Sequence, residues 1–197
     1  MNWFTNWFNS PYYHTLYKNR DKKEAELFID NLMYYLQIPK ESKLIDIACG
    51  KGRHAIYFNK KEMNVVGVDL STNSISYAKE HENSTLQFAV HDMREVYKVN
   101  YFDIVTNLFT SFGYFDDNTE EQKAINAMAS NLKIGGFLVI DFMNAKKVIS
   151  NLLLSEQKTI DDIKFDITRE VKDVHIIKNI AITDGTKKQQ FQEKVKI

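Results

Sequence analysis

The chain is poor in the residues that mark secreted, membrane or multidomain proteins. Its 197 residues include one cysteine, two prolines and seven glycines. A single cysteine excludes an intramolecular disulfide and is typical of a reducing compartment. No apolar stretch is long enough to cross a bilayer, and the N-terminus lacks a signal peptide's basic and apolar regions. We therefore expect a cytoplasmic protein with no membrane partner.

An excess of charge of one sign is also missing. Twenty-six basic residues balance 26 acidic ones, so no global field would gather nucleic acid, and a nucleic-acid partner is not expected. The length suits about one domain, and 44% hydrophobic residues are enough for a full core. These values are typical of a compact intracellular enzyme.

Residues 43–69 carry the most informative pattern in the chain. An apolar run, Leu44 to Ala48, leads into Gly50 and Gly52; a helix-forming stretch follows, then a second apolar strand that ends at Asp69. Glycines let the chain turn tightly and let backbone N–H groups approach a ligand. An acid about 20 residues after such a loop is placed to meet ribose hydroxyls. The pattern predicts a strand–helix–strand unit that binds a nucleotide cofactor.

Asp46 distinguishes between two kinds of cofactor. The glycines alone also fit a dinucleotide-binding loop with Ala55 in third place. Asp46, however, lies inside the first strand, where a carboxylate would repel a pyrophosphate but attract a positively charged ligand. S-adenosylmethionine, which carries a sulfonium and an ammonium group, fits this charge better.

Four segments in order resemble the class I S-adenosylmethionine-dependent methyltransferases. They are residues 46–54 (DIACGKGRH), 66–71 (VGVDLS), 91–94 (HDMR) and 102–109 (FDIVTNLF), and the resemblance spans about residues 12–144. It implies that the first motif holds the methionine end of the cofactor, that the acid of the second holds the ribose, that the third meets the adenine and that the fourth lines the methyl-transfer site. The cofactor-binding residues implied in this part of the chain are Asp46, Gly50, Gly52, Arg53, Asp69, Leu70, Asp92, Met93 and Asn107.

The first 20 residues contain seven aromatic side chains, several at helical spacing. They are interpreted either as a helix packed on the body or as a lid that closes over the cofactor. Tyr12, Tyr17 and Arg20 resemble lid residues that contact the cofactor in related enzymes, and we include Tyr17 and Arg20 among the cofactor-binding residues. Arg20 is equally suited to pair with an exposed acid. The predicted acceptor pocket comprises Tyr12, Tyr13, Phe109, Phe112 and Tyr114, although Phe109, Phe112 and Tyr114 also suit ordinary core positions.

Methyl transfer needs a base only when the acceptor must lose a proton. His14, His54 and His91 are the candidates, but each also has a purely structural interpretation, so the catalytic residues stay unassigned. Cys49 is interpreted as a small residue in a tight turn. The histidines and acids form no ligand-spaced cluster, so no metal is expected.

The predicted fold class is α/β: a Rossmann-like, mostly parallel methyltransferase sheet with helices on both faces, followed by an antiparallel β-meander. The predicted domains are residues 1–38 (aromatic helical lid), 39–154 (cofactor-binding core) and 155–197 (meander). Further features are a helix that begins near Asp21 and buries Leu27, Phe28, Leu32, Tyr35 and Leu36, a helix capped by Ser71, and a helix capped by Thr119 and ended by Gly135 and Gly136. Three meander strands are expected, at 160–169, 174–183 and 189–197, with a turn at Asp184 and Gly185.

The last two strands of the usual methyltransferase sheet are not evident in the sequence. Either the meander replaces them, or the chain is a shortened one whose sheet has an exposed edge; we favour the latter. An exposed edge, or the meander, also offers a surface for a homodimer.

The resulting functional hypothesis is transfer of a methyl group from S-adenosylmethionine to a small molecule, with S-adenosylhomocysteine as product. A protein that binds this cofactor without catalysis and a nicotinamide-dependent oxidoreductase are the alternatives. The second lacks a third glycine and an evident hydride-transfer partner.

Overall fold

The structure, a computed structural model, describes residues 3–18 and 22–197. The chain divides into two compact units. One comprises residues 21–112 and 116–142 and is called the sheet unit below; the other comprises residues 1–20, 113–115 and 143–197 and is called the meander unit. Among the described residues, no helix is long and apolar enough to cross a membrane.

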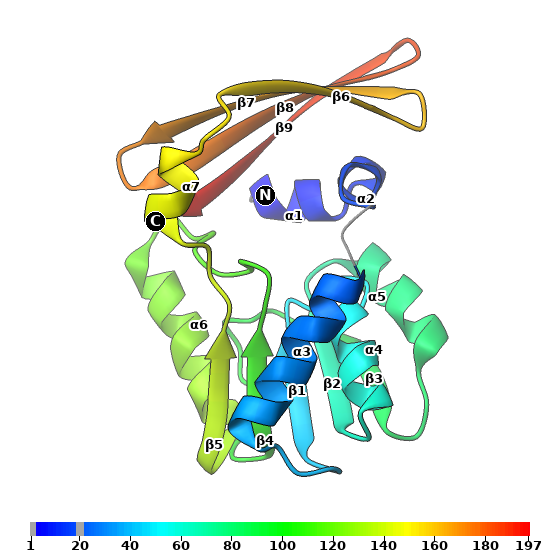
Figure 1. Cartoon of the computed structure of the whole chain (residues 1–197), viewed down its shortest axis with the longest axis vertical. Helices are drawn as coiled ribbons and strands as arrows, with labels where there is room; N and C mark the ends of the chain where they lie inside the picture. Colours follow the sequence, from blue (N-terminus) through cyan, green and yellow to red (C-terminus); the bar gives the residue numbers. More distant parts are fainter. Residues whose placement is uncertain (1–2, 19–21) are drawn as a thin grey trace. The chain divides into compact units, whose positions relative to one another are not determined.

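The sheet unit is built on five parallel strands (Figure 1). They are β1 (Lys43–Ile47), β2 (Asn64–Asp69), β3 (Leu86–Val90), β4 (Phe102–Asn107) and β5 (Leu132–Ile140), in the order β3-β2-β1-β4-β5. β1 lies at the centre, with Asp46 opposite Gly67 of β2 and Thr106 of β4. Its residues 44–47 are all buried, as expected of a strand covered on both faces. The predicted parallel α/β sheet is confirmed.

Helices cover both faces of this sheet. α3 (Lys22–Leu36), α4 (Arg53–Lys60) and α5 (Thr72–Ala78), which runs into a short 3₁₀ helix (Lys79–His81), pack on one face; α6 (Asn118–Asn131) packs on the other. Because strand side chains alternate, Leu44 joins the core beneath α4, whereas Ile45 joins the core beneath α6. Ser71 caps α5 as predicted, since its Oγ accepts a hydrogen bond from the Ser74 N–H group at 3.1 Å.

Some details of the helices differ from the predictions. α3 buries Ala25 and Ile29 and leaves Leu27, Phe28 and Tyr35 63%, 37% and 83% exposed, so the buried face is rotated from the predicted one; Leu32 and Leu36 are partly buried. The capping residue predicted at Asp21 lies outside the described residues.

The ends of α6 also differ from the predicted ones. Asp117, not Thr119, caps the helix, because its Oδ1 accepts a hydrogen bond from the Thr119 N–H group at 2.8 Å. α6 ends at Asn131, ahead of Gly135 and Gly136, which lie within β5. A Cβ on Gly136 would lie 2.7 Å from the Asp103 carbonyl oxygen, so this glycine permits close strand pairing and does not stop a helix.

The meander unit contains a four-stranded antiparallel sheet in sequence order. Its strands are β6 (Ser155–Ile160), β7 (Ile163–Lys172), β8 (His175–Asp184) and β9 (Lys187–Lys196). The predicted meander and its turn after Asp184 are confirmed, and β6 is an additional strand. The unit also holds α1 (Trp3–Phe8), α2 (Pro11–Leu16) and α7 (Ala145–Ser150).

α1 and α2 pack their aromatic side chains on one face of the antiparallel sheet. Trp7 is fully buried and contacts Phe191 of β9 with a ring-centroid distance of 4.9 Å. Trp7, Tyr12 and Leu16 share a core with apolar residues of β7 and β8: Phe165, Ile167, Ile180 and Ile182. Residues 3–18 therefore belong to the meander unit, and α3 belongs to the sheet unit.

Candidate functional site

The carboxyl ends of three adjacent strands carry the polar residues of the cofactor motifs. Asp46 lies in β1, Asp69 ends β2 and Asn107 ends β4, and the loop with Gly50 and Gly52 follows β1. Ligands of parallel α/β sheets bind at this edge, where neighbouring crossover connections diverge. The fold thus places motifs that are far apart in the sequence on neighbouring strands.

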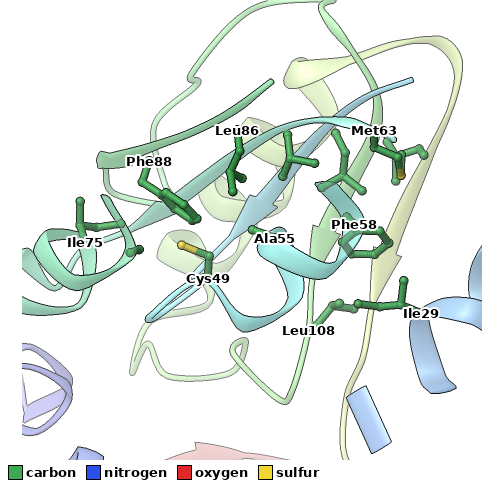
Figure 2. Close-up of a cluster of buried hydrophobic side chains, with 13 residues drawn as sticks. Ile29, Cys49, Ala55, Phe58, Met63, Ile75, Leu86, Phe88 and Leu108 are labelled. Atoms are coloured by element: carbon green, nitrogen blue, oxygen red, sulfur yellow. The ribbon is translucent and has the colours of Figure 1, made fainter. Parts of the chain in front are cut away.

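The two glycines of the loop are required for different structural reasons. Both have a left-handed backbone, with φ of 56° at Gly50 and 81° at Gly52. A Cβ on Gly52 would also lie 2.6 Å from the ring of Phe88, and one on Gly67 would lie 2.5 Å from the same ring. Figure 2 shows this ring in the core formed by α4, α5 and the sheet. Gly52 therefore lets the start of α4 pack closely on β3, whereas nothing lies within 4 Å of a Cβ on Gly50.

Asp69 joins the glycine loop to the end of β2. Its Oδ2 accepts a hydrogen bond from the Gly50 N–H group and its Oδ1 accepts one from the Ser71 N–H group, both at 2.8 Å. Burial raises the pKa of Asp69, and these two hydrogen bonds partly offset the rise. Each carboxylate oxygen keeps a second lone pair, which suits the ribose hydroxyls of a nucleoside.

Asp46 is a buried acid with one oxygen unsatisfied. It is 1% exposed, and its Oδ1 accepts a hydrogen bond from the Thr106 hydroxyl at 2.8 Å. Its Oδ2 accepts no hydrogen bond of normal geometry from the described residues. Desolvation raises the pKa of Asp46 to about 7, while the Thr106 hydroxyl lowers it, nearby Asp69 raises it further, and the Ala55 N–H group and Arg53 lower it.

Asn107 adds a second buried acceptor at the same edge of the sheet. Its Nδ2 donates to the Ile47 carbonyl oxygen at 3.1 Å, and its Oδ1 is buried without a hydrogen-bond donor among the described residues. Buried acceptors normally have partners, so two such oxygens on adjacent strands indicate a ligand that brings donors. The ammonium and sulfonium of S-adenosylmethionine fit two acids and an amide better than a pyrophosphate does.

The loop after β4 is held in an unusual conformation. Phe109 and Thr110 have φ of 64° and 53°, and both of their N–H groups donate to Asp141, to Oδ2 at 2.9 Å and to the carbonyl oxygen at 3.0 Å. Sequence reasoning missed Asp141, and also Thr106; the available signal was an acid directly after the apolar run of β5. The guanidinium of Arg53 lies 5.1 Å from the centre of the Phe109 ring, so the start of α4 and this loop meet.

The remaining predicted cofactor residues of the sheet unit lie just after β2 and β3. Leu70 is 40% exposed, and Met93 packs against the core beneath α6. The Asp92 carboxylate accepts hydrogen bonds from Arg94 Nε at 3.0 and 3.2 Å, which lowers the pKa of Asp92. Arg94 also pairs with Glu120 of α6 at 2.6 Å, so this loop is fixed to the helix.

The predicted aromatic site residues divide between the two units. Phe112 belongs to the sheet unit and packs against the core beneath α6. Tyr114 and Tyr13 belong to the meander unit and contact the Phe8 ring, with centroids 5.3 and 5.0 Å away.

The tyrosine hydroxyls of α2 and its C-terminal end bind acids of the antiparallel sheet. Tyr12 donates to Asp184 at 3.0 Å, and Tyr17 donates to Glu193 at 2.7 Å. Arg20 lies outside the described residues.

The candidate bases and Cys49 have local structural contacts. His54 lies 3.1 Å from the Arg53 guanidinium, and His91 Nε2 lies 2.9 Å from the Glu95 carbonyl oxygen. Burial raises the pKa of the Cys49 thiol well above its usual range, and the Asp46 and Asp69 carboxylates raise it further, so this cysteine is a poor nucleophile. Within residues 3–18 and 22–197, no three His, Cys, Asp or Glu side chains group closely enough to hold a metal ion.

Comparisons with known proteins agree with this site. Residues 44–136 match the family model described as a methyltransferase domain. A dTDP-3-amino-3,4,6-trideoxy-alpha-D-glucopyranose N,N-dimethyltransferase from Streptomyces venezuelae is 32% identical over 104 residues, which are 52% of this chain and 43% of that protein. The chain spans about half the length of the curated relatives it matches.

Solved structures share the fold over most of the chain. A S-adenosylmethionine-dependent methyltransferase from Clostridium acetobutylicum has a TM-score of 0.73 at 23% identity, and the match covers 93% of this chain and 77% of that one. CalS10 from Micromonospora echinaspora, an amino pentose methyltransferase solved with its cofactor bound, has a TM-score of 0.71 at 19% identity, covering 95% and 83%. The residues that build the site thus lie in a segment that matches a methyltransferase domain, and solved S-adenosylmethionine-dependent methyltransferases share the fold of the chain.

Proposed function

We propose that this chain transfers a methyl group from S-adenosylmethionine to a small-molecule acceptor. The observation that carries the proposal is the buried, half-satisfied carboxylate of Asp46 beside Asp69 and the glycine loop. Two acids at the carboxyl ends of β1 and β2 favour a cationic cofactor over a pyrophosphate. The nicotinamide-dependent alternative is therefore disfavoured.

In this proposal, the chain's own residues bind the cofactor, orient the acceptor and exclude water. Asp46 would hold the positively charged methionine end, the free lone pairs of Asp69 would hold the ribose, and Asp92 and Met93 would lie at the adenine. When bound, the cofactor would supply an electrophilic methyl group to the acceptor, and its sulfur would keep the electron pair of the carbon–sulfur bond. Alignment in a dry site provides most of the acceleration, so the fixed loop at Phe109 and Thr110 would position the acceptor.

Supporting evidence for a small acceptor comes from the relative with 32% identity, which acts on an amino sugar. An acceptor screen begins with amino sugars for this reason. We further propose that Tyr12, Tyr13, Phe109, Phe112 and Tyr114 contribute to the acceptor pocket, that Tyr17 and Arg20 contribute to the cofactor site, that the protein is cytoplasmic, and that it forms a homodimer through the free edge of β5.

Calorimetric titration with S-adenosylmethionine and, separately, with NAD tests the cofactor. We expect S-adenosylmethionine to bind and Asp69→Asn to weaken that binding at least about tenfold, or about 1.4 kcal/mol. Asp103→Asn is the matched control, because Asp103 lies near the amino end of β4 and pairs with Lys133 at 2.6 Å. Binding of NAD alone would overturn the proposal.

A methyl-transfer assay then separates an enzyme from a protein that only binds the cofactor. We expect formation of S-adenosylhomocysteine to depend on an added acceptor and to be lost in Asp46→Asn. A wild-type chain that binds S-adenosylmethionine but methylates no acceptor would favour the non-catalytic alternative.

A further inference from the structure

The meander unit contains a cavity of about 610 Å³ that the cofactor motifs do not use. It lies between the segment that begins with α7 and strands β7, β8 and β9, and all its lining residues belong to the meander unit. Figure 1 shows α7 beside this sheet. Its volume is within the range of small-molecule sites, about 300 to 1,000 Å³.

One face of the sheet lines both this cavity and the aromatic core. Phe165 and Ile167 of β7 contact the aromatic core, and Arg169, two residues further along, lines the cavity. On β8, the cavity residue Lys178 lies two residues before Ile180, which contacts the aromatic core, so both side chains are on the same face. The face therefore changes from apolar beneath α1 and α2 to charged at the cavity.

Two cations lie directly opposite each other on this charged part of the face. Arg169 of β7 pairs in register with Lys178 of β8, which in turn pairs with Glu193 of β9. The three side chains are only 18%, 12% and 17% exposed. Like charges at directly opposed positions destabilise a sheet, and burial makes the repulsion stronger. Desolvation lowers the pKa of Lys178, and the charges of Arg169 and Lys158 contribute to the lowering.

The acids nearby balance these cations only in part. Arg169 pairs with Glu156, and Lys178 lies 3.3 Å from Glu193. Lys147 of α7, a third cation on the cavity wall, has no ion pair within the described part of the chain. Three cations and one carboxylate, Glu193, therefore line the cavity, and Glu156 pairs with Arg169, so one positive charge stays unbalanced among these groups. An anion placed between them would relieve the repulsion.

Most of the remaining wall is apolar. Met143, Val148, Leu152, Ile176 and Val195 line it. We propose that this cavity binds an organic anion, with its apolar body against these residues and a carboxylate, sulfonate or phosphate group between Lys147, Arg169 and Lys178. None of the cavity residues belongs to the cofactor motifs, and the proposal does not depend on the proposed methyl transfer.

A pair of probes that differ in charge tests the inference. The sulfonate 1-anilinonaphthalene-8-sulfonate has an apolar body and an anionic end, and N-phenyl-1-naphthylamine has the same body without the charge. Titration calorimetry of the full chain should show one saturable sulfonate site and at least tenfold weaker binding of the neutral probe. Equal affinity for both probes, or no sulfonate binding, would overturn the proposal.

Variants of α7 locate the site. Val148→Trp fills the cavity and should abolish sulfonate binding, whereas Ile149→Trp, at a 42% exposed position outside the cavity, should not. Lys147→Glu should weaken sulfonate binding about tenfold and leave the neutral probe unchanged, and Lys146→Glu, outside the cavity, should change neither. Sulfonate binding that survives Val148→Trp, or that responds equally to both lysine variants, would contradict the proposal. S-adenosylmethionine titration of each variant shows separately whether the sheet unit is folded and whether the cofactor proposal holds.

Discussion

The contribution of the buried Asp46 to the stability of the folded state depends on pH. Its pKa is raised from 3.8 to about 7 by burial, so the folded protein binds a proton between these values that the unfolded chain has lost. The contribution of Asp46 to stability is therefore greatest below pH 4, falls as pH rises from about 4 to 7, and stays low above 7. Asp46→Asn removes this dependence.

We expect the stability of Asp46→Asn relative to the wild type to be greater at pH 8 than at pH 5 by about 2 to 4 kcal/mol. Urea unfolding at the two pH values checks this, and the variant should bind S-adenosylmethionine more weakly. Because Asp69 titrates in both proteins, the difference between them isolates Asp46. An equal stability difference at pH 5 and pH 8 would contradict the raised pKa.

Gly50 and Gly52 differ in what a side chain would meet. Both have positive φ, but only a Cβ on Gly52 approaches the Phe88 ring, at 2.6 Å. Gly50→Ala should cost about 1 kcal/mol through its backbone conformation, and Gly52→Ala should cost about 1 to 3 kcal/mol more because the core must also shift. Unfolding midpoints in urea measure both costs.

A double variant separates the two causes at Gly52. If the Phe88 ring causes the additional cost, Gly52→Ala combined with Phe88→Leu should be less destabilised than the sum of the single changes. Strict additivity would show that backbone strain alone is responsible.

At the scale of the elements, Glu193 fastens α1 and α2 to the antiparallel sheet. Its carboxylate accepts hydrogen bonds from Trp7 Nε1 and the Tyr17 hydroxyl, each at 2.7 Å, and it neutralises the buried Lys178. Glu193→Gln leaves Lys178 without a carboxylate partner and should destabilise the meander unit by about 1 to 3 kcal/mol. Both tryptophans of the chain lie in this unit, so tryptophan fluorescence during urea unfolding reports it directly.

Removing the positive charge as well should recover part of this loss. Lys178→Met combined with Glu193→Gln is expected to be more stable than Glu193→Gln alone, because no unpaired charge remains buried. A double variant that is less stable would show that Lys178 contributes mainly by packing.

The type and approximate place of most elements followed from local pattern, whereas the ends of α6, strand β6 and the contact faces of the helices did not. The glycine loop and alternating apolar residues predicted the strand–helix–strand unit and the meander. The 3.6-residue period of α3 allows more than one apolar stripe, and contact with α4 selected the stripe with Ala25 and Ile29 over the one with Leu27. Asp117 and Thr119 are both residue types that can cap a helix, so the sequence alone does not distinguish them. The geometry with which the chain enters α6 makes Asp117 the cap.

At the scale of the whole molecule, β5 is an edge strand of the parallel sheet. No strand among the described residues pairs with its outer side, and Ile134 and Phe137 are 100% and 45% exposed. Such an edge offers unpaired backbone groups to a second chain. The proposed homodimer should appear in light scattering after size exclusion, and Ile134→Lys should convert it to a monomer.

Leu154→Lys is the matched control for the edge, because Leu154 is 66% exposed in the meander unit. It should leave the dimer intact. A wild-type protein that stays monomeric at high concentration would exclude the homodimer. A dimer that only Leu154→Lys disrupts would place the interface away from the edge of β5.

The sequence by itself determined the parallel sheet, the class of cofactor and the antiparallel meander, because these depend on residue types at short, fixed spacings. Only the tertiary structure decided which partners the side chains have: Thr106 against Asp46, Asp141 beneath the loop at Phe109, Phe88 against Gly52, and Arg169 opposite Lys178. The first three of these contacts join residues more than 30 positions apart, and the fourth joins neighbouring strands. The geometry of all four depends on strand register or helix packing, which residue types at short spacings do not encode.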